Sequence, residues 1–196
     1  MVYLKDKQLY VFVDGNEKEA ALHVFLGDDY KGGYVSLFAH AKKDYGFNHF
    51  SITDKVTTKL PTGSGTSSSD NVFTADFDTT KFDTSAFKTY YLEHTKGNAT
   101  GKMKEDSFEN QWTIDNGVLE SNTQLETPTN KTMTEFEWDD STMVSVLTYN
   151  KKMKDFIVSY DYTKSWYRPM FMFGTELGKF ALSAPNTTQR GQGVLL

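Results

Sequence analysis

The sequence contains no cysteine, which excludes disulfide bonds, thiol catalysis and cysteine-based zinc sites. It has only 4 histidines, scattered without the H-x-H or H-x-x-x-H spacing of a metal site, and only 4 prolines. No uninterrupted apolar run reaches the ~18 residues that a membrane span needs. No basic cluster is present, and a net charge of −5 opposes binding to nucleic acid. The first residues lack the basic stretch and apolar core of a signal peptide, and we expect none there.

Aromatic residues are abundant instead, with 15 Phe, 11 Tyr and 3 Trp in 196 residues. Together with many Thr and Val, this composition favours β-strands. Apolar and polar residues alternate in short runs, so that Leu9, Val11 and Val13 lie on one predicted face and Tyr10 and Phe12 on the other. No helical period extends over ten residues. Two strands are predicted on either side of a turn at 5–7. Further strands are predicted at 22–26, 34–40, 47–52, 111–114, 118–120, 143–149, 155–163, 166–173 and 179–183, and another near 71–77.

Turn signals separate these strands. Asp14-Gly15-Asn16 follows the run at 8–13, and Asn116-Gly117 between two apolar-containing runs is a strong hairpin signal. We expect a short helix or irregular segment near 84–91 and a loop over 94–107. About eleven short strands with turns every 8–12 residues predict an all-β fold, a two-sheet antiparallel sandwich.

Residues 57–70, TTKLPTGSGTSSSD, contain no aromatic side chain and a single large apolar one. This composition is typical of a flexible linker. The total length suits one domain of ordinary size. We therefore predict a single sandwich domain, 1–196, in which 1–56 and 71–196 are complementary parts joined by the linker.

Several motifs on both sides of the linker resemble a known family. After the linker, FENQWTIDNGVLES places a tryptophan before an x-x-G-x-L hairpin, and DFIVSYDY and FMFG follow. Before it, YVFVDG, GYVSLFA and FNHFSI are similar to closing strands of the same kind of domain. The resemblance is to concanavalin A-like jelly-roll domains, which include laminin G-like and many carbohydrate-binding domains. It implies a jelly-roll sandwich whose closing half precedes its opening half.

This order suggests a circularly permuted domain. On that hypothesis the original termini are joined through 57–70, and Leu196 and Val2 mark a cut made within a sheet. A chain spanning the end of one tandem repeat and the start of the next is the alternative. The halves would meet within one chain, giving a monomer, or between chains, giving a domain-swapped oligomer.

The stretch DYTKSWYRPMFMFG has the composition of a sugar-binding site. Aromatic rings complement the C–H face of a sugar, and charged side chains bond to its hydroxyl rim. The alternative is that the tryptophan packs in the core while the arginine lies along the sheet. The predicted ligand-binding residues are Asp161, Trp166, Tyr167 and Arg168, with Trp138 and the pair His40 and Tyr45 as further candidates.

Acidic residues support two weaker hypotheses. Concanavalin A-like glucanases usually carry an E-x-D-x-x-E strand, which is missing here, but EFEWDD would place Glu135, Glu137 and Asp139 on one face of a strand. A solvated face of an edge strand or loop is the alternative explanation, and it is preferred. Asp-rich turns are calcium candidates, and ordinary turn chemistry is their alternative explanation. The calcium candidates are Asp14, Asn16, Asp28 and Asp29.

The resemblance and the aromatic-polar stretch together predict a non-catalytic carbohydrate-binding module. Its partner would be a glycan or polysaccharide, with no cofactor other than calcium. We expect it to belong to a larger secreted or cell-surface bacterial protein. Two alternatives stay open: an interaction domain, such as an adhesin or an engineered permuted scaffold, and a glycoside hydrolase. Fold by itself does not decide among them.

Overall fold

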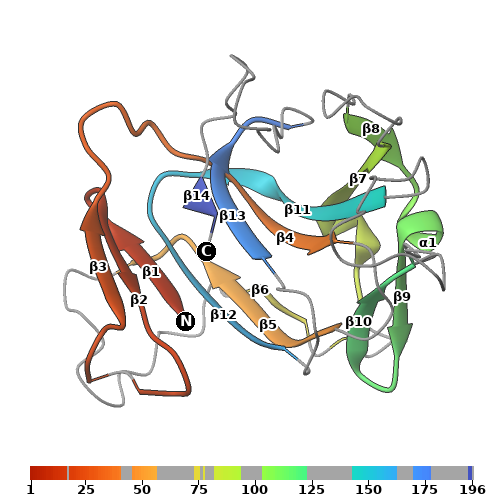
Figure 1. Cartoon of the computed structure of the whole chain (residues 1–196), viewed down its shortest axis with the longest axis horizontal. Helices are drawn as coiled ribbons and strands as arrows, with labels where there is room; N and C mark the ends of the chain where they lie inside the picture. The colour runs from red at the N-terminus through yellow and green to blue at the C-terminus, as the bar shows by residue number, and fades with distance from the viewer. Residues whose placement is uncertain are drawn as a thin grey trace, which may run out of the picture.

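A computed structural model describes residues 1–16, 18–40, 46–56, 73–75, 77, 82–93, 103–122, 143–162, 170–177 and 194–195. These residues form two sheets in which every strand pair is antiparallel (Figure 1). The two sheets share one hydrophobic core. The predicted all-β, two-sheet sandwich is confirmed. The jelly-roll connectivity and the permuted order stay predictions.

One sheet has eight strands in the order β3-β2-β1-β12-β5-β10-β9, and β6 also pairs with β5. Strand β5 therefore has β12 on one side and both β10 and β6 on the other. The strands are β1 (Val2–Lys5), β2 (Gln8–Val11), β3 (Leu22–Phe25), β5 (Gly46–Thr53), β6 (Phe73–Ala75), β9 (Trp112–Asp115), β10 (Val118–Ser121) and β12 (Phe156–Tyr162).

The other sheet has six strands in the order β14-β13-β4-β11-β7-β8. Its centre is the long strand β11, which pairs with β4 on one side and β7 on the other. The strands are β4 (Gly33–His40), β7 (Phe87–Glu93), β8 (Met103–Asp106), β11 (Met143–Met153), β13 (Met170–Thr175) and β14 (Val194–Leu195).

The core lies where alternating apolar residues of the two sheets meet. Phe156 of β12 contacts Phe171 and Phe173 of β13, with ring centroids 6.1 Å and 5.4 Å away, and all three are fully buried. The two phenylalanines of the FMFG motif are therefore core residues. Trp112 and Phe47 fill the core near β9 and β10. Burial of such large aromatic side chains is the main stabilising contribution available to this fold.

Two predicted turns are confirmed in detail. Asp14 and Gly15 both have positive φ, at 53° and 68°, and the N–H of Asn16 donates to the carbonyl of Val13 at 3.0 Å. Asn116 and Gly117 likewise have φ of 48° and 79°. Two successive positive φ values define the hairpin turn that Asp-Gly and Asn-Gly favour.

The structure differs from local expectations at three places. The short helix expected near 84–91 is present as the 3-10 helix η1 (Thr84–Ala86), but the rest of that segment belongs to strand β7. Part of the expected loop at 94–107 is strand β8, which pairs with β7. Its charged residues lack the apolar alternation by which a strand is recognised in a sequence. Val13 lies beyond the end of β2 and is 53% exposed. The number of strands was also too low, because 14 are present in the described residues.

Helix is scarce, as predicted. Among the described residues the helical segments are η1 and the single turn α1 (Phe108–Gln111). No helix in this part of the chain has the length and apolarity required to cross a membrane.

Segments from both sides of 57–70 interleave in both sheets. Strands β1 and β5 flank β12, and β4 lies between β11 and β13 (Figure 1). The two ends of the chain belong to different sheets, since β1 pairs with β2 and β12 whereas β14 pairs with β13. A strand running from β14 into β1 would therefore have to change sheets.

Candidate functional site

Most predicted site residues fall outside the described part of the chain. This holds for Trp138, Tyr45 and the group at 166–168, and for the weak catalytic candidates at 135, 137 and 139. His40 ends β4, where its backbone lies opposite that of Val144. Asp161 is the one ligand-binding candidate whose side chain is described. It lies near the end of β12, directly before the segment that carries Trp166, Tyr167 and Arg168.

Asp161 forms a close pair with a histidine of the neighbouring strand. The Nδ1 atom of His49 lies 2.8 Å from the Oδ2 atom of Asp161. The His49 side chain is 70% exposed and that of Asp161 71% exposed. The two polar groups therefore stay available to solvent and to a ligand while holding each other in one orientation.

A β-bulge places the histidine there. The register between β12 and β5 shifts, with Ser159 opposite Ser51 but Asp161 opposite Asn48. His49 has a φ of 45°, in the left-handed region that non-glycine residues seldom adopt. A bulge with its first residue in this conformation redirects the side chain and increases the local twist. The backbone is thus held in a costly conformation at the point where His49 meets Asp161.

A second unusual feature lies beside this pair. The side-chain oxygen Oδ1 of Asn48 is buried, and it has no hydrogen-bond partner among the described residues. An unsatisfied buried acceptor costs free energy and needs an explanation. Because Asn48 is the register partner of Asp161, this orphaned acceptor lies within the same bulge.

Two tyrosines complete this end of β12, and they differ in exposure. Tyr162 is 61% exposed. The ring of Tyr160 packs between Phe47 and Phe171, with centroids 5.7 Å and 5.9 Å away. Burial, with a smaller contribution from Tyr162, raises the pKa of Tyr160 to about 12. Tyr160 is a core residue, whereas Tyr162 is mostly exposed although it lies opposite Phe47, on the face of the sheet away from Asp161.

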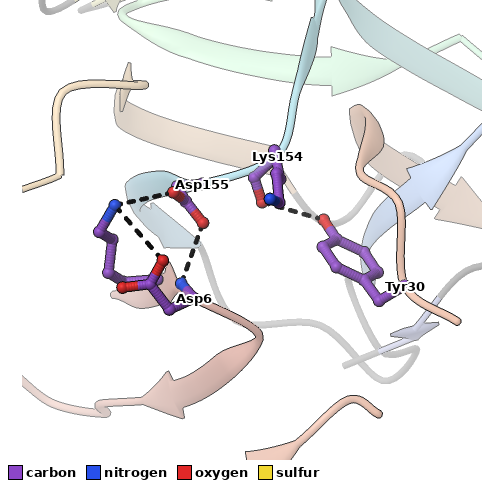
Figure 2. A network of polar contacts seen from close by, with 5 residues as sticks. Asp6, Tyr30, Lys154 and Asp155 are labelled. Carbon is purple, nitrogen blue, oxygen red and sulfur yellow. Dashed lines mark hydrogen bonds and ion pairs between the residues drawn. The ribbon is translucent and has the colours of Figure 1, made fainter. Parts of the chain in front are cut away.

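The opposite end of β12 carries a different polar network, drawn in Figure 2. The Asp155 carboxylate accepts from the Nζ atom of Lys5 at 2.9 Å and from the backbone N–H of Asp6 at 3.0 Å. The Tyr30 hydroxyl donates to the carbonyl of Lys154 at 3.4 Å. The hydrogen bond to Asp155 raises the pKa of Lys5, and burial raises that of Tyr30. This network joins the β1–β2 turn to the β11–β12 turn and is structural in character.

The calcium candidates occupy the two ends of β3. Asp14 and Asn16 lie in the turn after β2, where Asn16 accepts from the backbone N–H of Lys18. Asp28 follows β3 and is bound by Lys7 at 2.7 Å, which lowers the pKa of that carboxylate. Asp29 lies next to it in the same turn. Within the described residues, no three His, Asp or Glu side chains gather as metal ligands. Calcium binding stays a prediction.

Sequence reasoning missed His49, Asn48 and Tyr162. A signal for the bulge was present: in FNHFSI the two large apolar residues Phe47 and Phe50 are an odd number of positions apart, which strict strand alternation does not allow on one face. Both are buried in the core, so an extra residue must be accommodated between them.

Comparisons of the chain with protein-family models, with curated proteins and with solved structures give no match.

Proposed function

We propose that this protein is a non-catalytic glycan-binding module whose site lies at the Asp161 end of β12. The site consists of the His49–Asp161 pair, extended by the residues Trp166, Tyr167 and Arg168 that follow in the chain. Tyr162, which is also exposed at this end of β12, can contact a ligand that reaches around the end of the strand. The observation that carries the proposal is the exposed acid–base pair, held by a strained bulge.

These groups match the chemistry of a sugar. A pyranose ring offers an apolar C–H face, which stacks on an aromatic ring, and hydroxyl groups at its rim. A carboxylate accepts from those hydroxyls, and an imidazole either donates or accepts. The resemblance to concanavalin A-like domains points the same way.

Stability does not explain the arrangement. Exposed ion pairs contribute little, about 0–1 kcal/mol, to the free energy of folding. A non-glycine residue in the left-handed region costs of order 1–2 kcal/mol, so the backbone conformation of His49 costs at least as much free energy as the ion pair contributes. Backbone strain of this kind is concentrated at functional sites, where the surrounding structure maintains it.

A glycan array followed by isothermal titration calorimetry tests the proposal. Wild type is expected to bind at least one glycan class, and Trp166→Ala and Asp161→Asn should each weaken binding at least about tenfold. Tyr162→Ala should weaken it as well, whereas Tyr162→Phe, which keeps the ring, should retain most of the affinity. Glu105→Gln, which removes an exposed carboxylate paired with Lys88 in the other sheet, serves as the control.

Two results would overturn the proposal: no glycan bound by the wild type, or equal binding by wild type and all three weakened variants. Repeating the titration with a chelator tests the calcium hypothesis in the same experiment. Release of reducing sugar that disappears in Glu135→Gln would instead favour the hydrolase.

A further inference from the structure

Strand β3 is an edge strand without the usual protection. All four of its residues are exposed, and Leu22, Val24 and Phe25 are 40%, 39% and 54% exposed. It ends the order of the eight-stranded sheet and pairs with β2 alone among the described strands (Figure 1). Native proteins normally protect such edges with charge, proline or a bulge, because unpaired backbone groups recruit other strands.

An edge of the other sheet shows that protection. Strand β8 carries Lys104, Glu105 and Asp106 in its four residues, and Glu105 pairs with Lys88 at 2.7 Å. Two copies can meet through β8 only after desolvating these charged side chains, and registers that place Lys104 or Glu105 opposite its own counterpart bring like charges together. Strand β3 contains no Asp, Glu, Lys or Arg, so two copies of it can meet without that cost.

The direction of the free backbone groups follows from the hydrogen bonds that are made. The N–H of Leu26 donates to the backbone carbonyl of Lys7. Because every second residue of an antiparallel strand bonds to a given neighbour, Val24 and Leu22 are the residues of β3 that bond to β2. Met1 and Phe12 exchange two backbone hydrogen bonds, so Phe12 directs its backbone groups toward the β1 side. By alternation Leu9 and Val11 direct theirs toward β3, which agrees with the bonds to Leu22 and Val24. His23 and Phe25 therefore direct their N–H and C=O groups away from the sheet.

We propose that β3 pairs with β3 of a second copy of this chain, antiparallel, about a twofold axis at Val24. His23 of one copy then lies opposite Phe25 of the other, and both such pairs exchange two backbone hydrogen bonds. All four outward donors and all four outward acceptors are satisfied at once, and the two eight-stranded sheets become one continuous sheet.

The side chains suit this register. In this register, side chains on the same face of the two sheets lie opposite each other. The half-exposed Val24 therefore contacts Val24 of the second copy, on the face from which Leu9 and Val11 pack into the core. On the other face the ring of His23 is already fixed, stacked on Tyr10 with centroids 4.1 Å apart and bonded to Gln8 at 2.8 Å. The edge is ordered before pairing, which lowers the entropic cost of association.

The small size of the contact limits the strength of the dimer. Pairing of two strands of 4 residues buries less than the ~1,600 Å² of a standard interface. We expect a weak dimer, populated at protein concentrations of about 0.1–1 mM. Because each copy carries a net charge of −5, added salt should strengthen association, the opposite of an interface held by ion pairs.

Sedimentation equilibrium of the full chain, with two variants at one position, tests the proposal. Phe25→Ala and Phe25→Pro both remove the ring, but only proline removes the outward N–H, and it disturbs no bond to β2. By symmetry it deletes two intermolecular bonds, so the dissociation constant should be at least about tenfold higher than that of Phe25→Ala. Val24→Lys, which brings two ammonium groups together, should be monomeric.

Amide hydrogen exchange on the wild type gives a second measurement that needs no variant. The amides of His23 and Phe25 should become protected as concentration rises, while that of Val24, bonded within the sheet, should not change. A wild type that stays monomeric throughout this concentration range overturns the proposal, and so does equal association by Phe25→Pro and Phe25→Ala with both folded.

Discussion

The two ends of β12 carry the same kind of residue in opposite surroundings. At the start, the side chain of Asp155 is 19% exposed and bonds to Lys5 and to the backbone of Asp6. At the end, the side chain of Asp161 is 71% exposed and bonds to His49 alone among the described residues. Apolar neighbours follow the same division, since Phe156 is fully buried and Tyr162 is 61% exposed.

The contrast separates stability from function. A carboxylate that satisfies a backbone N–H and a lysine in a partly shielded position contributes to folding. An exposed pair on a strained bulge contributes little to folding but presents polar atoms in a fixed geometry. Variants at the start of β12 should therefore lower the free energy of unfolding, whereas variants at its end should affect ligand binding more than stability.

The largest expected difference is between the aromatic residues. Phe156→Ala should lower the free energy of unfolding by about 3–5 kcal/mol, because it leaves a cavity against Phe171 and Phe173. Tyr162→Ala should change it by no more than about 0.5 kcal/mol. Urea denaturation measures both. Phe156→Leu, which retains most of the volume, should cost clearly less than alanine, and similar losses at Phe156 and Tyr162 would contradict the division.

The aspartates should differ less. Asp155→Ala leaves the N–H of Asp6 without its acceptor and should cost about 1–2 kcal/mol, whereas Asp161→Ala should cost about 0.5 kcal/mol or less. Thermal unfolding at neutral pH compares them. Lys5→Met keeps the bond from Asp6 and removes only the ammonium group, so it should lie between the two. Equal effects of the two aspartate variants would argue against a structural role for the Asp155 network.

A pH series tests the division within β12 itself. Burial raises the pKa of Tyr160 to about 12 from its ordinary value of 10.0. The neutral hydroxyl is favoured in the folded state, so its contribution is complete below pH 10 and is lost as the pH rises from about 10 to 12. Tyr160→Phe should move alkaline unfolding to higher pH. Tyr162→Phe should leave the midpoint nearly unchanged, and an equal shift in both variants would show that the two rings are not distinguished by burial.

The smallest expected effect concerns the bulge. His49→Gly relieves the positive φ and should raise the free energy of unfolding by up to about 1 kcal/mol. His49→Val removes the same imidazole but places a β-branched residue in that conformation, and it should destabilise. The difference between the two variants in urea isolates backbone strain. A glycine variant that is less stable than wild type would mean that the bulge is not strained.

Local chemistry made parts of the fold predictable. Asp14-Gly15 and Asn116-Gly117 adopt the expected turn because few residues tolerate two successive positive φ values. The strand predicted at 34–40 is present as β4 (Gly33–His40), because its β-branched and aromatic residues favour extended backbone. Strand β8 escaped detection because its residues are charged, and only its pairing with β7 defines it as a strand.

The candidate site was predictable only in part. Asp161 was singled out because it lies close to aromatic residues and an arginine in the sequence. Its partner His49 was not, since 112 positions separate them and only the register of β5 on β12 brings them together. The same applies to Lys5 and Asp155, which are 150 positions apart.

The sequence alone determined the fold class, the positions of the two tight turns and the approximate positions of many strands. These properties depend on backbone preference and on the period of two, both of which act over a few residues. The tertiary structure decided which aspartate is buried and which is exposed, where the bulge falls, and that β3 is left at an edge. Burial and register depend on strands that are distant in the chain, and no short stretch of sequence contains both partners.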